Sequence, residues 1–321
     1  MADFDSPTVA ERAGGGIADS DALTPTVLFT LEYIPPPPEL EGFVTTFYLF
    51  RCDERDIRDV QPAAVGHLIV FLRGKGEMQF ASGRTDPSHP ISLLTPCSAA
   101  APIVVEGPFH CVGAALSPLG WAALSGLHAG ESADRMIAAS DVFGPEADDL
   151  GAQLTAAYED GVAAESLVGI LGEFLAARLM PVNPRHAALM QAFAEWLGAG
   201  FDPALDDLLA RSNYSPRQTQ RLVERYFGLP PRELKRKYRA LRVAGALGQP
   251  NVPDAEVAML ANLFYDQSHM IREIRHFVGR TPGRLADESE TILSALIDMK
   301  NYREIEPQVA AMPDYGANDS Q

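Results

Sequence analysis

Two short segments of this chain carry side chains suited to contact nucleic acid. Arginine and glutamine donate hydrogen bonds to base edges and to phosphate oxygens, and serine and histidine can also bond to either. In each segment the side chains recur mainly at intervals of three or four residues, which places them on one face of a helix. The residues are Arg217, Gln220, Arg221 and Arg225 in the first segment, and Gln267, Ser268, His269, Arg272 and Arg275 in the second. The pattern predicts two helices that each present a polar face to DNA.

Each segment begins and ends with residues that delimit a helix. Ser215 stands before Pro216 and three residues before Gln218, the arrangement of a capping box with proline in the first helical position. Asp266 is the expected cap of the second helix. A glycine follows each segment, where the left-handed backbone that ends a helix is expected. In the second helix an apolar stripe of Met270, Ile271, Ile274 and Phe277 is expected to face the core.

The elements that must position these helices can also be predicted. A short helix is expected before each of them, at 206–211 and at 254–260, so that each pair forms a helix-turn-helix unit. Asn213 suits a left-handed turn in the first unit. Residues 232–242 are rich in helix formers and predict a rigid linker helix. Its basic side chains, expected to contact phosphates or to lie in solvent, are Lys235, Arg236, Lys237 and Arg239.

The two units, their linker helix, the Asp-Gln-Ser-His run at 266–269 and the Gly-x-Thr-Pro run at 279–282 resemble the AraC/XylS-type family of bacterial transcription regulators. The resemblance covers about residues 202–286. Family members insert their two recognition helices into successive major-groove segments about 34 Å apart. The resemblance therefore implies a sequence-specific transcription regulator with double-stranded DNA as its partner.

Two positions depart from the family pattern. Leu263 stands where the family usually has a glycine in the turn, so Asn262 would take the strained backbone or the turn would be reshaped. Thr219 replaces a bulky apolar residue of the first recognition helix. These departures leave an alternative open, in which the chain is an interaction protein that keeps the fold without specific DNA binding.

The distribution of charge supports DNA binding. Residues 205–285 hold 14 lysines and arginines against 8 aspartates and glutamates, a local charge of +6 in a chain of net charge −17. The remainder must therefore carry −23. DNA would repel a chain whose negative charge was spread evenly, and a basic island overcomes that repulsion locally.

Residues 27–128 have a different character, with short β-prone runs separated by turn signals at 74–76, 82–84 and 106–108. This pattern predicts an antiparallel barrel or sandwich. The prolines at 35–38, the strand that follows them and residues 116–121 resemble the cupin-like sensory domain of one AraC-type subgroup. The resemblance implies a small barrel that could hold a small-molecule effector.

No catalytic or metal site is predicted. Metal-dependent cupins use a His-x-His pair with a later glutamate and histidine, whereas His67, His89, His110 and His128 occur singly. The sequence also lacks the Gly-x-Ser-x-Gly elbow, the P-loop and the dinucleotide fingerprint. We therefore expect no cofactor. Cys52, Cys97 and Cys111 have no paired spacing and are interpreted as buried thiols, with a redox sensor as the alternative.

Residues 131–200 are expected to be helical, with helices at 146–158, 165–180 and 184–197. The strongest apolar stripe, which could pack within the chain or form the interface of a homodimer, is Leu167, Ile170, Leu171, Phe174 and Leu175.

The predicted fold class is α+β, and the sequence divides into five segments. The segments are a flexible tail at 1–26, a β-rich cupin-like domain at 27–130, the helical region at 131–200, the double helix-turn-helix domain at 201–286, and a C-terminal helix with an acidic tail at 287–321. The sequence contains no run of about eighteen apolar residues, so no membrane span is expected. The acidic N-terminus lacks a signal segment and favours a cytoplasmic protein.

Overall fold

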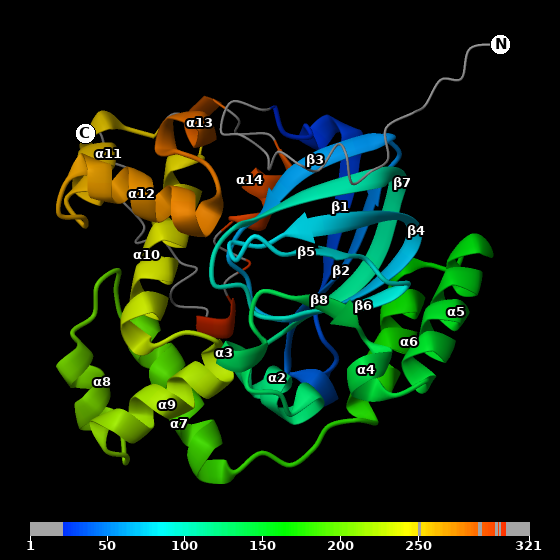
Figure 1. Ribbon diagram of the computed structural model, residues 1–321, viewed down its shortest axis with the longest axis horizontal. Coiled ribbons are helices and arrows are strands. Elements are labelled where there is room, and N and C mark those ends of the chain that lie inside the picture. The colour runs from blue at the N-terminus through cyan, green and yellow to red at the C-terminus, as the bar shows by residue number, and fades with distance from the viewer. Residues whose placement is uncertain (1–21, 250–251, 288–290, 299–300, 302, 306–321) are drawn as a thin grey trace, which may run out of the picture.

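The computed structural model describes residues 22–249, 252–287, 291–298, 301 and 303–305. An antiparallel sheet forms the N-terminal part, and the C-terminal helices lie beside it and contact it (Figure 1). This α+β arrangement confirms the predicted fold class.

The sheet curves around an apolar interior. Its main path follows the order β1-β2-β7-β4-β6-β8, while β3 pairs with β7 and β5 pairs with β4. All of these pairings are antiparallel. The strands are β1 Phe29–Ile34, β2 Val44–Cys52, β3 Asp56–Gln61, β4 His67–Gln79, β5 Thr85–Pro87, β6 Ile91–Leu94, β7 Ala101–Leu116 and β8 Met136–Ala138.

Two of the three predicted turns are wrong, because the chain continues as a bent strand through both. The 74–76 segment lies inside β4, where the register against β7 shifts on both sides of Arg73 and Gly74 has a φ of +79°. A glycine at a β-bulge bends a strand without ending it. The 106–108 segment lies inside the 16-residue strand β7. The sequence interpretation also missed β3, β5 and β8.

Three helices that the sequence did not predict, α2 Pro118–Ser125, α3 Ala129–Ser132 and α4 Ser140–Phe143, precede the expected ones. Short 3-10 turns are η1 Thr26–Leu28 and η2 Pro38–Leu40 near the start and η4 Arg303–Ile305 near the end. The helices that accompany the sheet are α2, α3 and α4 together with α5 Glu146–Glu159 and α6 Ala164–Ala176. The later helices are α7 Pro184–Gly198, α8 Leu205–Arg211, α9 Pro216–Phe227, α10 Pro231–Leu247, α11 Asp254–Ala261, α12 Gln267–Val278, α13 Pro282–Asp287 and α14 Ile292–Leu296.

Helices α5 and α6 cover one side of the sheet (Figure 1). Leu167, Leu171 and Leu175 of α6 are completely buried in one core with Leu40 and Phe47. The leucines of the predicted stripe therefore pack within the chain and are not available as a dimer interface.

Both predicted tails contain ordered residues. Leu23 and Thr24 are buried, and the Thr24 amide donates to the Arg58 carbonyl of β3 at 3.2 Å. The tail predicted at 1–26 is thus too long, and residues 1–21 lie outside the described part of the chain. At the other end, the predicted C-terminal helix is the short helix α14, and residues 306–321 of the predicted acidic tail lie outside the described part.

All three cysteines are buried and free. Burial raises the pKa of Cys97 and of Cys111 to about 12, and it also raises the pKa of Cys52. Because the thiolate is the reactive form, these thiols are poor nucleophiles at neutral pH. The structure favours the buried-thiol interpretation over a redox sensor.

Candidate nucleic-acid interface

Helices α8 and α9 form the first helix-turn-helix unit. The Ser215 hydroxyl accepts from the Gln218 amide, and the Gln218 side chain bonds in return to the Ser215 amide. At the other end, Gly228 takes a φ of +88° and its amide donates to Glu224 O at 3.0 Å. The backbone groups at both ends of α9 thus have local partners, which fixes where the helix begins and ends.

Val223, Tyr226 and Phe227 of α9 are buried, and its opposite face is open to solvent. The exposed side chains are Arg217, Gln220, Arg221 and Arg225, three of which are four residues apart. They form one row along the helix, with three positive charges and one amide that can reach base edges or phosphates.

The second unit consists of α11 and α12. The Asp266 carboxylate accepts from the His269 amide at 2.7 Å and caps α12. Gln267, Ser268, Arg272 and Arg275 are exposed, whereas Met270, Ile274 and Phe277 are buried beneath them. The exposed set again forms one row along its helix.

His269 does not belong to that row. Its side chain is 32% exposed and its Nε2 lies 3.4 Å from Oε1 of the buried Glu273. The ring also packs edge-on against Phe264. The structure therefore turns this predicted DNA-binding residue toward the interior.

Both turns differ from the expected conformations. The left-handed backbone expected at Asn213 is wrong, because Asp134 is the only non-glycine residue with positive φ in the described part of the chain. Asn262 is right-handed, with φ −68° and ψ −10°. Leu263 therefore requires no strained backbone, and its side chain packs against the C-terminal core.

Thr219 also has a structural explanation. It is completely buried, and its hydroxyl forms a 2.7 Å hydrogen bond with Ser212 in the turn. The hydroxyl is thereby satisfied, so a small polar residue can occupy a position inside this unit.

The basic residues of α10 are not the solvated or phosphate-contacting set that the sequence suggested. Lys237 is 3% exposed, and its ammonium donates to the carbonyl oxygens of Ala64 at 3.2 Å and Cys97 at 3.3 Å, both in the N-terminal part. Lys235 pairs with Asp202 at 2.9 Å. Arg242 and Arg280 are also buried. Four of the local positive charges therefore stabilise the fold and cannot reach DNA, namely Lys237, Arg239, Arg242 and Arg280.

A buried carboxylate joins α10 to α12. Glu273 is 1% exposed and accepts from Arg239 at 2.6 Å through one oxygen and from Arg236 at 2.5 Å through the other. Arg236 also pairs with the half-exposed Glu233 at 2.7 Å. This cluster sets the position of the second recognition helix on the linker helix.

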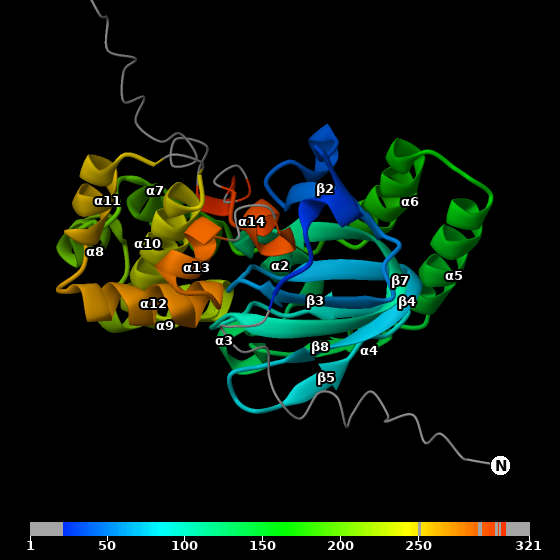
Figure 2. The same ribbon diagram turned by 90° about the horizontal axis from the view of Figure 1, so that it is seen from above.

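The two recognition helices lie along the same side of the C-terminal body, with α10 behind them (Figure 2). Helix α9 packs against α2, α3 and α7. The C-terminal end of α12 meets the barrel, where the Ala63 amide donates to the Phe277 carbonyl at 2.8 Å and the Ala100 amide donates to the His276 carbonyl at 2.9 Å. Each recognition helix is therefore in contact with the N-terminal part.

A substitution at Gly279 tests how tightly the C-terminal end of α12 packs against the barrel. A Cβ added at Gly279 would lie 2.3 Å from the Val60 side chain, and the residue has a φ of +89°. Gly83 has a similar φ of +82° but open space around it. We expect Gly279→Ala to lower the free energy of unfolding by about 1–3 kcal/mol more than Gly83→Ala, because only the first creates an overpacked contact. Urea unfolding of both variants measures the difference, and equal losses would contradict a tight contact.

The sequence interpretation did not identify one exposed residue that could contact DNA. Tyr265, in the turn before α12, is 93% exposed. An exposed aromatic ring with a hydroxyl, placed directly before a recognition helix, can contact a phosphate or a sugar. Its position directly before the helix cap Asp266 is the sequence feature that could have identified it as a candidate contact.

The barrel contains a partly open cavity of about 170 Å³. Its wall includes side chains from the strands and from the C-terminal segment after α13. Representative lining residues are Leu31, Tyr48, Phe50, His67, Met78 and Leu296. Within the described residues there is no group of histidine, cysteine, aspartate and glutamate side chains that could hold a metal ion. The described helices likewise include none that is long and apolar enough to cross a membrane.

Comparison with known proteins places the helical units in a family. Residues 208–288 match the model of a helix-turn-helix domain. No curated protein matches the chain. Among solved structures, ToxT of Vibrio cholerae at 1.65 Å is 8% identical with a TM-score of 0.44, covering 81% of this chain and 98% of its own. ToxT of Vibrio cholerae O395 is 9% identical with a TM-score of 0.42, covering 82% and 98%. Similarity this low carries no information on function.

Proposed function

Because residues 208–288 form a helix-turn-helix domain of the AraC type, we propose that this chain is a transcription regulator that binds a specific DNA sequence and responds to a small molecule. Helices α9 and α12 enter two successive segments of the major groove. The barrel holds the effector.

The observation that carries this proposal is the pair of exposed polar rows on α9 and α12, on the same side of one domain (Figure 2). Gln267, Ser268 and Arg272 read bases in one segment of the groove. Arg217, Gln220 and Arg221 read the other, since arginine and glutamine match guanine and adenine edges. Arg225 and Arg275, nearer the helix ends, contact phosphates and contribute affinity without sequence preference.

The effector part of the proposal is supported by the mainly apolar cavity in the barrel and by the contacts between the two parts of the chain. The cavity wall reaches Ala64, whose carbonyl accepts from Lys237 of α10. A molecule in the cavity that favours one arrangement of this wall shifts the equilibrium between arrangements of the DNA-binding helices.

The first test is selection of genomic fragments by the purified chain, followed by affinity measurements on the best fragments at several salt concentrations. A regulator of this type yields a motif with two segments about one helical turn, 34 Å, apart, and an affinity that falls as salt rises. Absence of enrichment over random DNA, with and without cell metabolites, would favour the alternative of an interaction protein.

Arg272→Ala is the sharpest test of base reading. We expect the variant to bind the selected site about 5- to 150-fold more weakly, which corresponds to about 1–3 kcal/mol for a lost base contact. Its affinity for random DNA should change much less. Fluorescence anisotropy with the selected and the random duplex measures both.

The matched control is Arg84→Ala, which removes an exposed arginine from the barrel, between β4 and β5. It should bind both duplexes within about twofold of wild type, because Arg84 is an exposed charge outside both helix-turn-helix units and its long-range effect is screened by salt. Unchanged binding of Arg272→Ala to both duplexes would remove Arg272 from the interface.

A further inference from the structure

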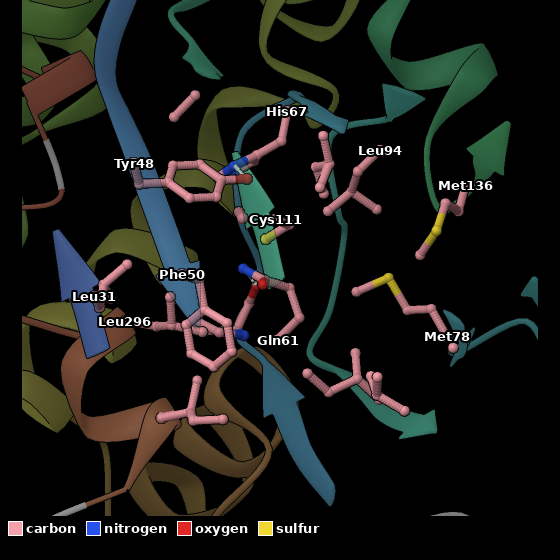
Figure 3. Close-up of a pocket in the computed structure, with 18 of the residues that line it drawn as sticks. Leu31, Tyr48, Phe50, Gln61, His67, Met78, Leu94, Cys111, Met136 and Leu296 are labelled. Atoms are coloured by element: carbon pink, nitrogen blue, oxygen red, sulfur yellow. Dashed lines mark hydrogen bonds between the residues drawn. The ribbon is translucent and has the colours of Figure 1, made fainter. Parts of the chain in front are cut away.

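The cavity of the barrel has a mainly apolar wall. Aromatic and aliphatic side chains from several strands surround it, and Phe50, Met78, Leu94 and Met136 point into it (Figure 3). Its volume of about 170 Å³ is comparable to that of an engineered apolar cavity of roughly 150 Å³ that binds benzene. The cavity therefore has room for one small ring.

One side of the cavity is polar and uncharged. The Tyr48 hydroxyl lies 3.2 Å from His67 Nδ1 (Figure 3). Burial, with a smaller contribution from Lys237, lowers the pKa of His67 to about 4, and burial raises the pKa of Tyr48 well above its usual value. Both side chains are neutral at physiological pH, so they can form hydrogen bonds with a ligand without contributing charge.

Two carboxyl groups on the wall have an oxygen without a partner. Oε1 of Glu77 and Oε2 of Glu304 are buried and accept no hydrogen bond within the described residues. Burial also raises the pKa of Glu304. An unsatisfied buried acceptor is costly, and a hydrogen-bond donor on a ligand would relieve that cost.

The wall does not favour an anionic ligand. No lysine or arginine is among the described residues that line the cavity. The nearby ammonium of Lys237 is bound to the carbonyl groups of Ala64 and Cys97 and does not line the cavity. An anion would lose its hydration and meet only neutral or acidic groups, a combination that opposes binding.

Residues 291–298, 301 and 303–305, together called segment 291–305 below, supply one wall of this cavity. Ile292, Leu296, Asn301 and Glu304 line it from outside the strands. The Asn301 side chain is hydrogen-bonded to Tyr33 of β1. The segment therefore covers the cavity and is attached to the barrel.

The same segment is part of the core of the DNA-binding helices. Leu293, Ile297 and Ile305 are buried in the core that contains α10 and α12. The Tyr238 hydroxyl of α10 donates to Glu304 Oε1 at 2.8 Å. Glu304 thus contacts the linker helix through Oε1, while Oε2 is an acceptor without a hydrogen-bond partner among the described residues.

We propose that the barrel binds a small, uncharged and mainly apolar molecule with a hydrogen-bond donor, and that segment 291–305 covers this molecule and links its presence to the DNA-binding helices. The proposal rests on the proposed function, because it specifies the effector of that regulator. The polar group of the molecule lies near Tyr48, His67 and Glu304, and its apolar part lies near Phe50 and Met78.

Three single-ring probes of nearly equal size test the ligand class: benzyl alcohol, benzoate and benzylamine. Isothermal titration calorimetry on the full chain at neutral pH compares a neutral donor with an anion and a cation. We expect benzyl alcohol to bind one site with a Kd at least about tenfold lower than that of either ion, because the ions must lose their hydration on entering the cavity. Equal or tighter binding of benzoate or benzylamine would overturn the proposed class, and so would the absence of saturable binding by benzyl alcohol.

Two variants, together with one control, test where in the barrel the ligand binds. Leu296→Trp fills the cavity from the covering segment and should abolish binding of benzyl alcohol, whereas Met180→Trp places the same ring at a position that is 48% exposed and should leave binding unchanged. Tyr48→Phe keeps the ring and removes one hydroxyl, and should raise the Kd by about 2- to 12-fold. Unchanged affinity in both Leu296→Trp and Tyr48→Phe would overturn the location.

DNA binding is measured separately on the same proteins. Benzyl alcohol binding without any selected DNA site would contradict the proposed function and leave the ligand class intact. Selective DNA binding without benzyl alcohol binding would contradict only the present inference. The link through segment 291–305 predicts that benzyl alcohol changes the affinity of wild type for its selected site and has no effect on Leu296→Trp.

Discussion

Glu273→Ala is expected to lower the free energy of unfolding by about 3–5 kcal/mol, because it leaves two arginines without their buried partner. Glu273 is 1% exposed and accepts from both Arg236 and Arg239. The Arg239 side chain is itself 9% exposed and retains only the half-exposed Asp202, at 3.2 Å. A buried guanidinium cannot recover its lost hydration, so the loss is large.

The measurement is urea unfolding at neutral pH, analysed for both the midpoint and its slope. Glu233→Ala is the matched control, since it removes a carboxylate that pairs with the same Arg236 but whose side chain is 41% exposed. We expect the control to lose no more than about 1 kcal/mol, the usual contribution of an exposed ion pair. If the two variants lost the same small free energy, the cluster would not be what holds α12 on α10.

The variant should also weaken DNA binding. The carboxylate of Glu273 faces the linker helix, whereas Arg272 and Arg275 beside it face solvent. Loss of this anchor allows α12 to shift relative to α9, so the two rows no longer match two groove segments at a fixed separation.

The dependence of stability on pH is expected to change in opposite directions in Asp59→Asn and His67→Gln. Burial raises the pKa of Asp59 to about 7, although hydrogen bonds from the Val60 and Leu293 amides and the charge of Arg280 oppose the shift. The folded chain therefore holds a proton between about pH 4 and pH 7 that the unfolded chain has released. Asp59 contributes stability below about pH 4 that is lost as the pH rises to about 7, by about 4 kcal/mol.

His67 acts with the opposite sign. Its pKa is lowered to about 4 by burial, so between about pH 4 and pH 6.5 the unfolded chain holds a proton that the folded chain does not. Stability is therefore lost as the pH falls through this interval. The full shift corresponds to about 3 kcal/mol, an upper value because the ring lines a cavity that water can enter.

Urea unfolding between pH 4 and pH 7.5 on wild type and both variants separates the two contributions. The other titrating groups are common to all three proteins, so the differences between the curves report Asp59 and His67 alone. Asp59→Asn should gain stability relative to wild type as the pH rises from 4 to 7. His67→Gln should gain relative to wild type as the pH falls from 6.5 to 4. Parallel curves would show that neither group has a shifted pKa.

The local features of the recognition helices could be read directly from the sequence. The boundaries of α9 follow from Ser215, Gln218 and Gly228, because a capping box and a left-handed glycine act within a few residues. The exposed rows follow from helical periodicity. These features depend on neighbours in sequence, so no knowledge of the rest of the fold was needed.

Partners distant in the sequence decided the rest. Lys237, Arg239 and Arg242 look like solvated helix residues in the sequence, and only the tertiary structure shows that they are buried against carbonyl groups and carboxylates contributed by other elements. The leucines of the α6 stripe were compatible with a dimer interface in the sequence, and only the tertiary structure shows that they are buried within the chain. Gly74 marked a turn by its type, whereas the pairing of β4 with β7 made it a bulge.

The same reason applies to the effector cavity. The sequence by itself indicated two helix-turn-helix units that follow an antiparallel barrel or sandwich. It did not indicate that segment 291–305 returns to line the barrel, because nothing in Ile292 or Leu296 specifies a partner more than two hundred residues away. Contacts at that separation are selected by the shape and apolar surface of the whole fold, which is a property that only the tertiary structure has.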